Sequence, residues 1–204
     1  MDHLVHTVLH LIKTHPDLAA LIIGLTAFGE SFAVVSFLIP GTTILVAAGT
    51  LVTKGVLNPV TAGVAAAVGA ILGDAISYWI GITFGRALPN HWPFKQHHAT
   101  LDRGVRFFER YGWLSVFIGR FLGPLRAFVP LVAGMCRMPV VPFYSANILS
   151  AVIWAPALLY SGYLIGLVFQ AHWTAQEKAL AVAAAAIVFV AIGALTRRIF
   201  LHVR

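Results

Sequence analysis

Some ionisable side chains lie inside otherwise apolar stretches of the sequence: Glu30, Asp74, Arg120 and Arg126. Each costs about 2.5–3.5 kcal/mol at the centre of a membrane span, so each needs a partner that compensates its charge. Two arginines present rigid forks of donors that match phosphate oxygens, and both stay protonated at physiological pH. Neutralising one glutamate would not require both. We therefore interpret Arg120 and Arg126 as ligands of a phosphate-bearing anion; the alternative is that they only form buried ion pairs that hold two segments together.

Glu30 is the first candidate for proton coupling. An ionised carboxylate competes with phosphate for an arginine, whereas a protonated carboxyl group releases that arginine. Asp74, in the sequence "GDAISYWIG", is the second candidate, and capping of a local helix break would explain it equally well. These residues predict a site in which protonation and anion binding are linked.

A second phosphate contact is predicted at the sequence "PGTT", residues 40–43. Pro40 ends a helix because proline lacks the N–H group and restricts the residue before it. The backbone N–H of Gly41 and the hydroxyl groups of Thr42 and Thr43 would then be available to phosphate oxygens. Alternatively, the threonines only satisfy the broken backbone.

The composition indicates the surroundings of these residues. The chain has 204 residues, of which 59% are hydrophobic and 10% are charged, and its mean hydropathy is +0.87. Soluble proteins carry about 25% charged residues. The balance indicates an integral membrane protein and excludes both intrinsic disorder and a secreted disulfide scaffold. The one cysteine, Cys136, excludes an intramolecular disulfide and a paired-cysteine zinc site.

The net charge of +7 does not indicate binding of nucleic acid, because the basic residues form no single patch. They gather in a hydrophilic segment, residues 86–110, and at the C-terminus, a distribution typical of cytoplasmic segments in membrane proteins. We therefore expect these segments in the cytoplasm, the N-terminus outside, and no nucleic-acid partner. No basic region precedes the first apolar run, so we expect no cleaved signal peptide.

Apolar segments of about 20 residues or more predict transmembrane helices. They cover residues 58–86, 141–166 and 177–200 approximately. Residues 99–111 predict an amphipathic helix at the interface, because Leu101, Val105 and Phe108 recur at helical spacing. The predicted fold class is therefore an all-α integral membrane protein with transmembrane helices and interfacial amphipathic helices.

Two other apolar segments, residues 18–52 and 112–136, contain charges, prolines and glycines and predict re-entrant helical hairpins. We assign the hairpin breaks to Pro40, Gly123, Pro124 and Pro130. Irregular backbone at membrane depth persists only where protein or a wet cavity covers it. On an unbroken helix Arg120 and Arg126 would point about 120° apart, and the break between them lets both face one cavity.

The two hairpins resemble each other in sequence. Aligning "FGESFAVVSFLIPG" (28–41) with "IGRFLGPLRAFVPL" (118–131) places Gly29 on Gly119, Glu30 on Arg120 and Pro40 on Pro130. The spans that follow align "ISYWIG" with "YSGYLIG", which places Gly81 on Gly166. We therefore predict one membrane domain over residues 1–204, with repeat 1 at about 1–86, repeat 2 at about 95–166 and a C-terminal helix at about 177–200.

Each predicted unit crosses the membrane an odd number of times, so the two units in tandem form an inverted repeat. Inverted repeats whose broken helices meet near the midplane are typical of secondary transporters, and the break points mark the binding site. The second hairpin is expected to insert from the cytoplasm and the first from outside.

The remaining motifs carry no catalytic chemistry. His3, His6 and His10 share one helical face and could bind a metal outside the membrane. We interpret them as interfacial polar residues and assign no metal site. The sequence contains no HExxH, glycine-rich phosphate loop, GxSxG or paired cysteines. We therefore expect neither an enzyme nor a cofactor.

At these same residues the sequence resembles the DedA family of bacterial inner-membrane proteins, which is related to the eukaryotic VTT-domain lipid scramblases. The resemblance covers about residues 20–170 and rests on "GRFLGPLRAFVPLVAGM" (119–135) and "GDAISYWIGITFG" (73–85). Arg120 and Arg126 match the family's two essential arginines, and Glu30 matches its essential first-hairpin glutamate. Many members carry a second acid where this chain has Thr42, as in the YabI-like subgroup, so this hairpin has one carboxylate.

The resemblance implies a multi-pass protein of the bacterial inner membrane that transports lipid phosphates. It implies above all the recycling of undecaprenyl phosphate to the cytoplasmic face, dependent on the proton motive force. The expected partners are a lipid phosphate substrate and membrane lipids. A homo-oligomer stays open, because the glycine-rich segment 63–73 could pack within the monomer or between subunits.

Two alternatives to this function remain. The first is a phospholipid scramblase or phosphatidylethanolamine transporter without energy coupling. The second is a structural or osmosensing membrane protein in which the buried charges only hold the hairpins together.

Overall fold

The structure is a computed structural model that describes residues 2–15, 18–33, 35–36, 39–85, 105–106, 108–122, 126–170 and 176. In this part of the chain the regular elements are all helices. Three predicted features lie outside the described residues: the C-terminal helix at 177–200, most of the basic segment 86–110, and the Gly123-Pro124 break.

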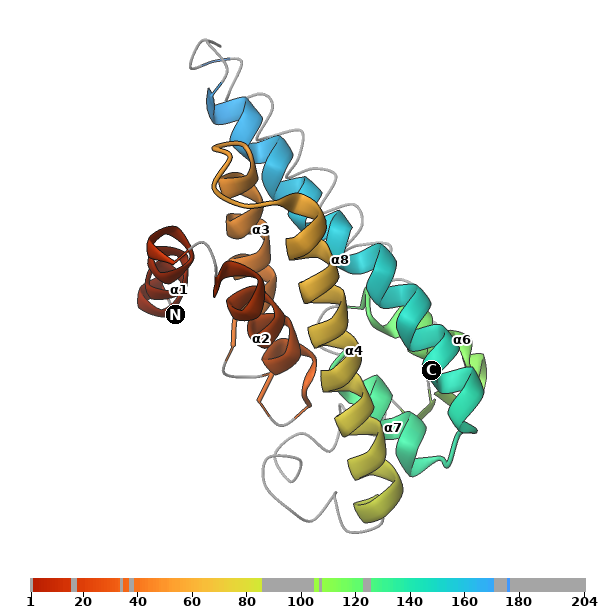
Figure 1. The fold of residues 1–204 in the computed structure, drawn as a ribbon. Coiled ribbons are helices and arrows are strands. Elements are labelled where there is room, and N and C mark those ends of the chain that lie inside the picture. Colours follow the sequence, from red (N-terminus) through yellow and green to blue (C-terminus); the bar gives the residue numbers. More distant parts are fainter. Residues whose placement is uncertain are drawn as a thin grey trace.

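Two long apolar helices run side by side through the molecule (Figure 1): α4, Pro59–Phe84, and α8, Val140–Gln170. They have 26 and 31 residues, and at a rise of about 1.5 Å per residue each is long enough to cross a bilayer core of about 30 Å. Asn58 fixes the start of α4, because its side chain accepts hydrogen bonds from the N–H groups of Val60 and Thr61. Both helices fall where the apolar runs predict them.

The two apolar segments at 18–52 and 112–136 form four shorter helices: α2 (Ala19–Ser31), α3 (Gly41–Val52), α6 (Leu114–Gly119) and α7 (Phe128–Met135). None has the length of about 20 residues that a crossing requires. The pair α2 and α3 lies toward one end of the long helices and the pair α6 and α7 toward the other (Figure 1). Within these pairs α2 and α7 pack on α4, and α3 and α6 pack on α8.

The helices meet at glycines, where a backbone approaches another backbone directly. A Cβ atom added at Gly69 on α4 would collide with the backbone of Gly24 on α2. The same holds for α4 and α7 at Gly81 and Gly134. Glycine allows this close approach because it has no side chain. In the glycine-rich segment 63–73, Gly69 and Gly73 therefore pack within the molecule.

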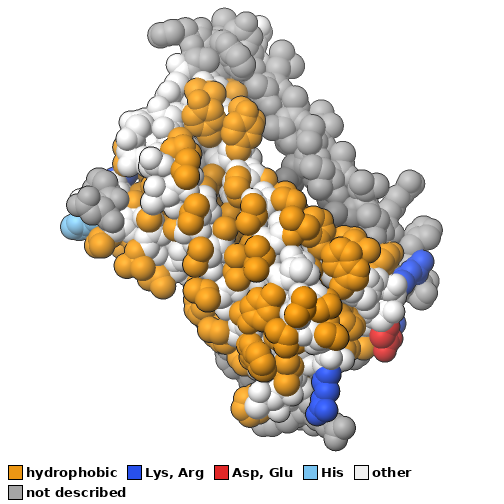
Figure 2. All heavy atoms as spheres, turned by 45° about the vertical axis from the view of Figure 1, so that its right-hand side comes forward, with side chains coloured by type: hydrophobic (Ala, Val, Ile, Leu, Met, Phe, Trp, Pro, Cys, Tyr) orange, Lys and Arg blue, Asp and Glu red, His pale blue; other side chains and the backbone are white. Residues whose placement is uncertain are grey.

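The outer surface of the long helices is apolar. Large hydrophobic side chains recur every fourth residue along α4 and are exposed: Val60, Val64, Val68, Leu72 and Ile76. Figure 2 shows hydrophobic side chains spread over the face on view, with few charged ones. An apolar surface that extends along a whole helix is unfavourable in water and is the surface expected to contact lipid.

The first helix, α1 (Asp2–Thr14), is amphipathic. Its Ile12 is fully buried, whereas His6, His10 and Lys13 are exposed. The helix packs on α2 and α3. Such an element matches the interfacial segment expected at the start of the chain. Of the interfacial helix predicted at 99–111, residues 105–106 and 108–111 are described, and they are helical.

Candidate functional site

Arg120 is held by side chains from both long helices. It is the residue directly after α6 and only 6% exposed. Its guanidinium group forms an ion pair with Asp74 on α4 and donates a hydrogen bond to the side-chain carbonyl of Asn147 on α8. Its Nε donates to the Ser150 hydroxyl oxygen at 2.9 Å. Because four side chains from three segments share these bonds, Arg120 ties the second short-helix pair to α4 and α8.

The partners of Arg120 are themselves fixed. The Asn147 side-chain amide donates to the carbonyl oxygen of Ile71 on α4 at 3.1 Å, and the Ser150 hydroxyl donates to the carbonyl oxygen of Asn147 at 3.0 Å. Asn147 and Ser150 are both fully buried. Polar groups in an apolar interior are costly unless they are hydrogen-bonded, so this network is satisfied as a unit.

Arg126 takes part in a separate network with Glu30. Glu30 lies at the end of α2, is 4% exposed and forms an ion pair with the Arg126 guanidinium group. The Thr42 hydroxyl donates to the same carboxylate oxygen, Oε1. The other oxygen, Oε2, is buried and has no hydrogen-bond partner among the described residues. A carboxylate oxygen without a hydrogen-bond partner in an apolar interior is energetically costly, so Oε2 is the unsatisfied atom of this network.

Gly41 makes room for this carboxylate. A Cβ atom added at Gly41 would lie against Glu30 Oε2 and at 2.7 and 2.8 Å from the Cβ and Cδ atoms of Glu30. Gly41 is the first residue of α3 and directly follows Pro40. The break between α2 and α3 therefore brings the start of one helix against the end of the other.

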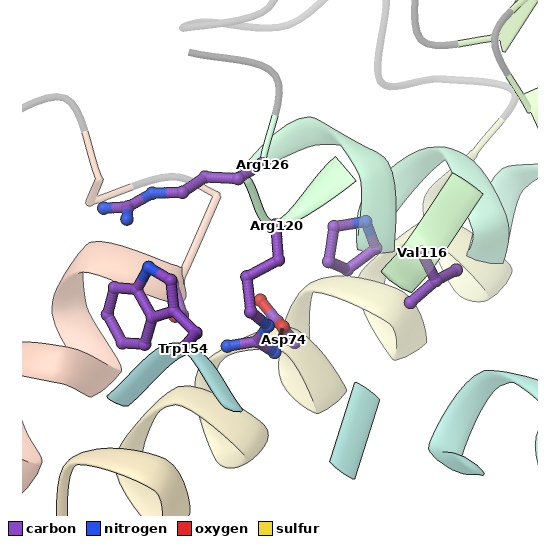
Figure 3. Close-up of a pocket in the computed structure, with 7 residues that line it drawn as sticks. Asp74, Val116, Arg120, Arg126 and Trp154 are labelled. Carbon is purple, nitrogen blue, oxygen red and sulfur yellow. Dashed lines mark hydrogen bonds and ion pairs between the residues drawn. The ribbon is translucent and has the colours of Figure 1, made fainter. Parts of the chain in front are cut away.

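Trp154 on α8 lies between the two networks. The Cζ atoms of Arg120 and Arg126 are 5.8 Å and 5.2 Å from the centre of its ring system. Figure 3 shows the Arg126 side chain above the indole and Arg120 beside it, at the level of Asp74. Trp154 is 5% exposed, so both cations meet a desolvated aromatic ring.

These residues enclose a small cavity of about 10 Å³, a volume that holds about one water molecule. It is lined by Ser31, Asp74, Val116, Arg120, Arg126, Pro130 and Trp154. Two arginines and two carboxylates make the group electrically neutral when all four are ionised. The arrangement can exchange one anionic partner of an arginine for another, and it offers no nucleophile paired with a base among the described residues.

The structure places the predicted site residues in two networks, of which Arg126, Arg120 and Asp74 line the cavity and Glu30 reaches it through its ion pair with Arg126. Arg126, Glu30, Thr42 and Gly41 form the first, and Arg120 and Asp74 belong to the second. Thr43, predicted as a phosphate contact, is exposed on α3 and does not line the cavity. The Thr42 hydroxyl is already bonded to Glu30. Asp74 caps no break, because α4 continues through it without interruption.

The predicted break positions also differ in what they do. Pro40 lies in the break between α2 and α3 but does not end a helix, because α2 already ends at Ser31 and Pro40 directly precedes α3. Pro130, by contrast, lies in the first turn of α7, where its missing N–H group removes no intrahelical hydrogen bond. Pro130 is therefore a helix-starting residue that lines the cavity and is not itself a break.

Sequence reasoning missed three residues of the site, all on α8: Asn147, Ser150 and Trp154. Their spacing of three and four residues puts them on one face of a helix. A signal for them was therefore present, because Asn147 and Ser150 are polar residues inside an apolar span, where hydrogen-bonding groups need a partner.

The family model of the VTT domain matches residues 39–164. The inner membrane protein YabI of Escherichia coli is 35% identical over 158 residues, which are 77% of this chain and 62% of that protein. Protein DedA of Escherichia coli is 32% identical over 174 residues, 81% of this chain and 78% of that protein.

The uncharacterized membrane protein BU139 of Buchnera aphidicola is 32% identical over 157 residues, 77% of this chain and 61% of that protein. The matched region thus spans less than two thirds of the length of two of these relatives, at 61% and 62%. No solved structure matches the chain.

Proposed function

The chain belongs to the VTT-domain family, the DedA-type membrane proteins of the bacterial inner membrane, and on this premise we propose that it carries a phosphate-bearing lipid across that membrane. The observation that supports the proposal is that the buried Arg120 and the largely buried Arg126 line one cavity between short and long helices, and that each is ion-paired with a buried acid. Buried ionisable groups in a membrane interior mark substrate and ion pathways.

We propose further that α2 with α3 and α6 with α7 are re-entrant hairpins of an inverted repeat. The closest support is at the glycine crossings of α7 on α4 and of α3 on α8. A Cβ atom added at Gly134 would contact three backbone atoms of α4: a carbonyl oxygen, a Cα atom three residues further on and an amide nitrogen one residue after that. A Cβ atom added at Gly49 would contact the same three kinds of backbone atom on α8, at the same spacing. The residues met are Tyr78, Gly81 and Ile82 on α4, and Leu159, Gly162 and Tyr163 on α8.

The short helices also support a repeat, in a register of 90 residues that differs from the 85 residues separating Gly49 from Gly134. A Cβ at Gly29 would meet the Ile39 side chain, and a Cβ at Gly119 would meet the Val129 side chain. These pairs keep the register in which Gly29 aligns with Gly119. On the long helices the contacts make Gly81 equivalent to Gly162, one helical turn before the Gly166 that the sequence alignment chose.

The two arginines would contribute differently to binding a phosphate. Arg120 is fixed by Asp74, Asn147 and Ser150, whereas the ion pair of Arg126 within the described residues is with Glu30. A phosphate group that enters the cavity therefore competes first with Glu30 for Arg126. Arg120 then supplies a second positive charge from a fixed position.

Proton coupling follows from the same competition. Glu30 Oε2 is the buried acceptor without a partner in the described part of the chain, so a proton can settle there without displacing Thr42 from Oε1. A neutral Glu30 releases Arg126 to the lipid phosphate, and loss of the proton expels the phosphate. Asp74, which is bonded directly to Arg120, is the second proton-coupling candidate.

We propose undecaprenyl phosphate as the lipid and return to the cytoplasmic face as the direction, driven by the proton motive force. The charges of the site support a phosphate headgroup, and the resemblance to the family supports this particular lipid. We propose a transporter and no enzymatic step. A structural role is the second candidate, because both arginines are fully ion-paired as the molecule stands.

Reconstitution into liposomes tests the proposed function. Movement of a short-chain prenyl phosphate is measured with and without an imposed pH gradient. We expect the gradient to accelerate movement in the unsubstituted protein and to have no effect in Glu30→Gln, whose folding is checked by thermal unfolding because the substitution removes the counter-charge of Arg126.

Three results would contradict the proposal or part of it. Equal movement with and without the gradient identifies an uncoupled scramblase, and unchanged coupling in Glu30→Gln removes Glu30 from the mechanism. No movement in either condition favours the structural role. Native mass spectrometry of gently solubilised protein identifies any anionic lipid that co-purifies.

A further inference from the structure

Arg126 has fewer described partners than Arg120. Arg120 keeps three hydrogen-bonded side chains. Arg126 has the Glu30 carboxylate and the ring of Trp154, and its side chain is 17% exposed. When Glu30 is neutral, the indole is therefore the described contact that still favours the cation. An arginine in an apolar interior without any compensating group would turn toward water.

From this geometry we propose that Trp154 is a positioning residue for the lipid headgroup: its ring holds the Arg126 guanidinium at the cavity after Glu30 has released it. The inference rests on the proposed function, because it concerns the state in which the phosphate binds. Trp154 lies at the cavity wall, directly against both arginines. Trp154 therefore acts on the phosphate through Arg126 and does not contact the phosphate itself.

The geometry of a guanidinium group makes this role compatible with phosphate binding. A cation above an aromatic ring is attracted by the negative charge of the ring face. The five N–H donors of arginine point outward in the plane of the group, so contact with a ring leaves these donors free for oxygen atoms. A carboxylate, in contrast, occupies the same donors that a phosphate needs. Trp154 and a phosphate can therefore hold Arg126 at the same time, whereas Glu30 and a phosphate compete.

The same ring also reduces the electrostatic repulsion between the two arginines. Arg120 and Arg126 would repel each other in a cavity of low polarity. Each has its Cζ atom within 6 Å of the ring centre, at 5.8 and 5.2 Å, so one buried indole offsets part of both charges. Loss of the ring should disturb Arg126 more than Arg120, because Arg120 keeps its hydrogen bonds to Asn147 and Ser150.

Binding of farnesyl phosphate to the purified full chain in detergent tests the inference. The variants are Trp154→Phe and Trp154→Leu, each made alone and combined with Glu30→Gln, which represents the neutral state. Trp113→Phe is the matched control, because Trp113 is 50% exposed and lies outside the cavity lining. In the Glu30→Gln background we expect the affinity to fall in the order Trp, Phe, Leu, with Trp154→Leu about tenfold weaker.

Two further results are expected if Trp154 acts through Arg126. Trp113→Phe binds as its parent does, and Trp154→Leu has no additional effect once Arg126→Gln is present. If Trp154→Leu does not fold, Trp154→Phe decides the question. In a double-mutant cycle read by thermal unfolding, Trp154→Phe should cost less stability in the Arg126→Gln background than in the unsubstituted protein.

The possible failures are distinguishable. If Arg126→Gln weakens farnesyl phosphate but Trp154→Phe and Trp154→Leu in the Glu30→Gln background do not, Trp154 has no positioning role and the proposed function stands. If farnesyl phosphate binds neither the unsubstituted protein nor Glu30→Gln, the proposed function fails. The double-mutant cycle then tests the contact between Trp154 and Arg126 separately. If the stability losses of Trp154→Phe and Arg126→Gln simply add, the two residues are not coupled and the inference is wrong.

Discussion

Arg120 and Arg126 are close in the sequence and chemically identical, yet their surroundings give them different freedom. Arg120 is enclosed by Asp74, Asn147 and Ser150. Arg126 depends on Glu30 and the face of Trp154. Removing one partner of a buried ion pair leaves an uncompensated charge. The two arginines should therefore respond differently when their acids are substituted.

Asp74→Asn should lower stability strongly. The substitution leaves Arg120 buried without a counter-charge, and breaking a buried pair from one side costs about 3–5 kcal/mol. Thermal unfolding in detergent measures the loss. The double variant with Arg120→Gln should recover most of it, because neither charge then remains. Normal unfolding of Asp74→Asn would mean that Asn147 and Ser150 alone satisfy Arg120.

Gly41→Ala should disturb the Glu30 network. The added methyl group would lie 2.7 Å from the Glu30 Cβ atom and against its free carboxylate oxygen, and forced insertion into a packed site costs about 1–3 kcal/mol. Gly63→Ala is the control, because its Cβ would meet only a Leu159 methyl group at 3.9 Å. There the loss of glycine should raise helix stability by about 0.5–1 kcal/mol. Thermal unfolding compares the two, and equal effects would contradict the tight contact at Gly41.

The sequence predicted the acids and arginines of the site but not their pairing. Charged residues in apolar runs are visible without coordinates, since their insertion cost is high wherever the chain places them. Which acid meets which arginine depends on helix crossings that bring residues 30 and 126 together. Thr42 and Thr43 show the limit of prediction from sequence. They are adjacent and of the same type, yet Thr42 donates to Glu30 whereas Thr43 is exposed.

Among the elements, the glycine crossings determine how the short helices sit on the long ones. Apolar runs and helix breakers predicted where α2, α3, α4 and α8 lie along the chain. The sequence alignment placed Gly81 on Gly166, whereas the proposed repeat pairs Gly81 with Gly162, because glycine is frequent in this composition and several alignments look alike. Atomic contacts distinguish these alignments, because a glycine that faces another backbone leaves no room for a Cβ atom, whereas Gly63 does leave room for one.

Gly49→Ala and Gly134→Ala should have similar effects, because they alter equivalent crossings. At each, a Cβ atom would meet the backbone of a long helix, including a carbonyl oxygen and a glycine Cα. Each variant should lose about 1–3 kcal/mol of stability. The two losses should add in the double variant, since independent distant sites usually do. A large loss at one crossing with none at the other would argue against the inverted repeat.

At the scale of the whole molecule, the proposed inverted insertion predicts which residues face each side of the membrane. The turn after α3, which contains exposed Lys54, and the end of α7, where Cys136 is exposed, lie toward opposite ends of the long helices (Figure 1). With the basic segment in the cytoplasm, Cys136 should face the cytoplasm and Lys54 the outside.

A membrane-impermeant maleimide tests this arrangement. Cys136 should react in inverted vesicles and not in intact cells, and Lys54→Cys in a Cys136→Ser background should do the opposite. Partial burial and the nearby Glu109 raise the pKa of the Cys136 thiol, so its thiolate fraction and its rate of labelling should increase as the pH rises. Labelling of both positions from one side would rule out the proposed insertion.

The cavity at the centre has room for about one water molecule, at about 10 Å³. An ion that passed through it would have to shed its hydration shell in a space whose charges already cancel. We therefore expect the described part of the molecule to offer small ions no path through this cavity. Cells that produce the protein in quantity should keep their membrane potential, because conduction of small ions would require the helices to separate first.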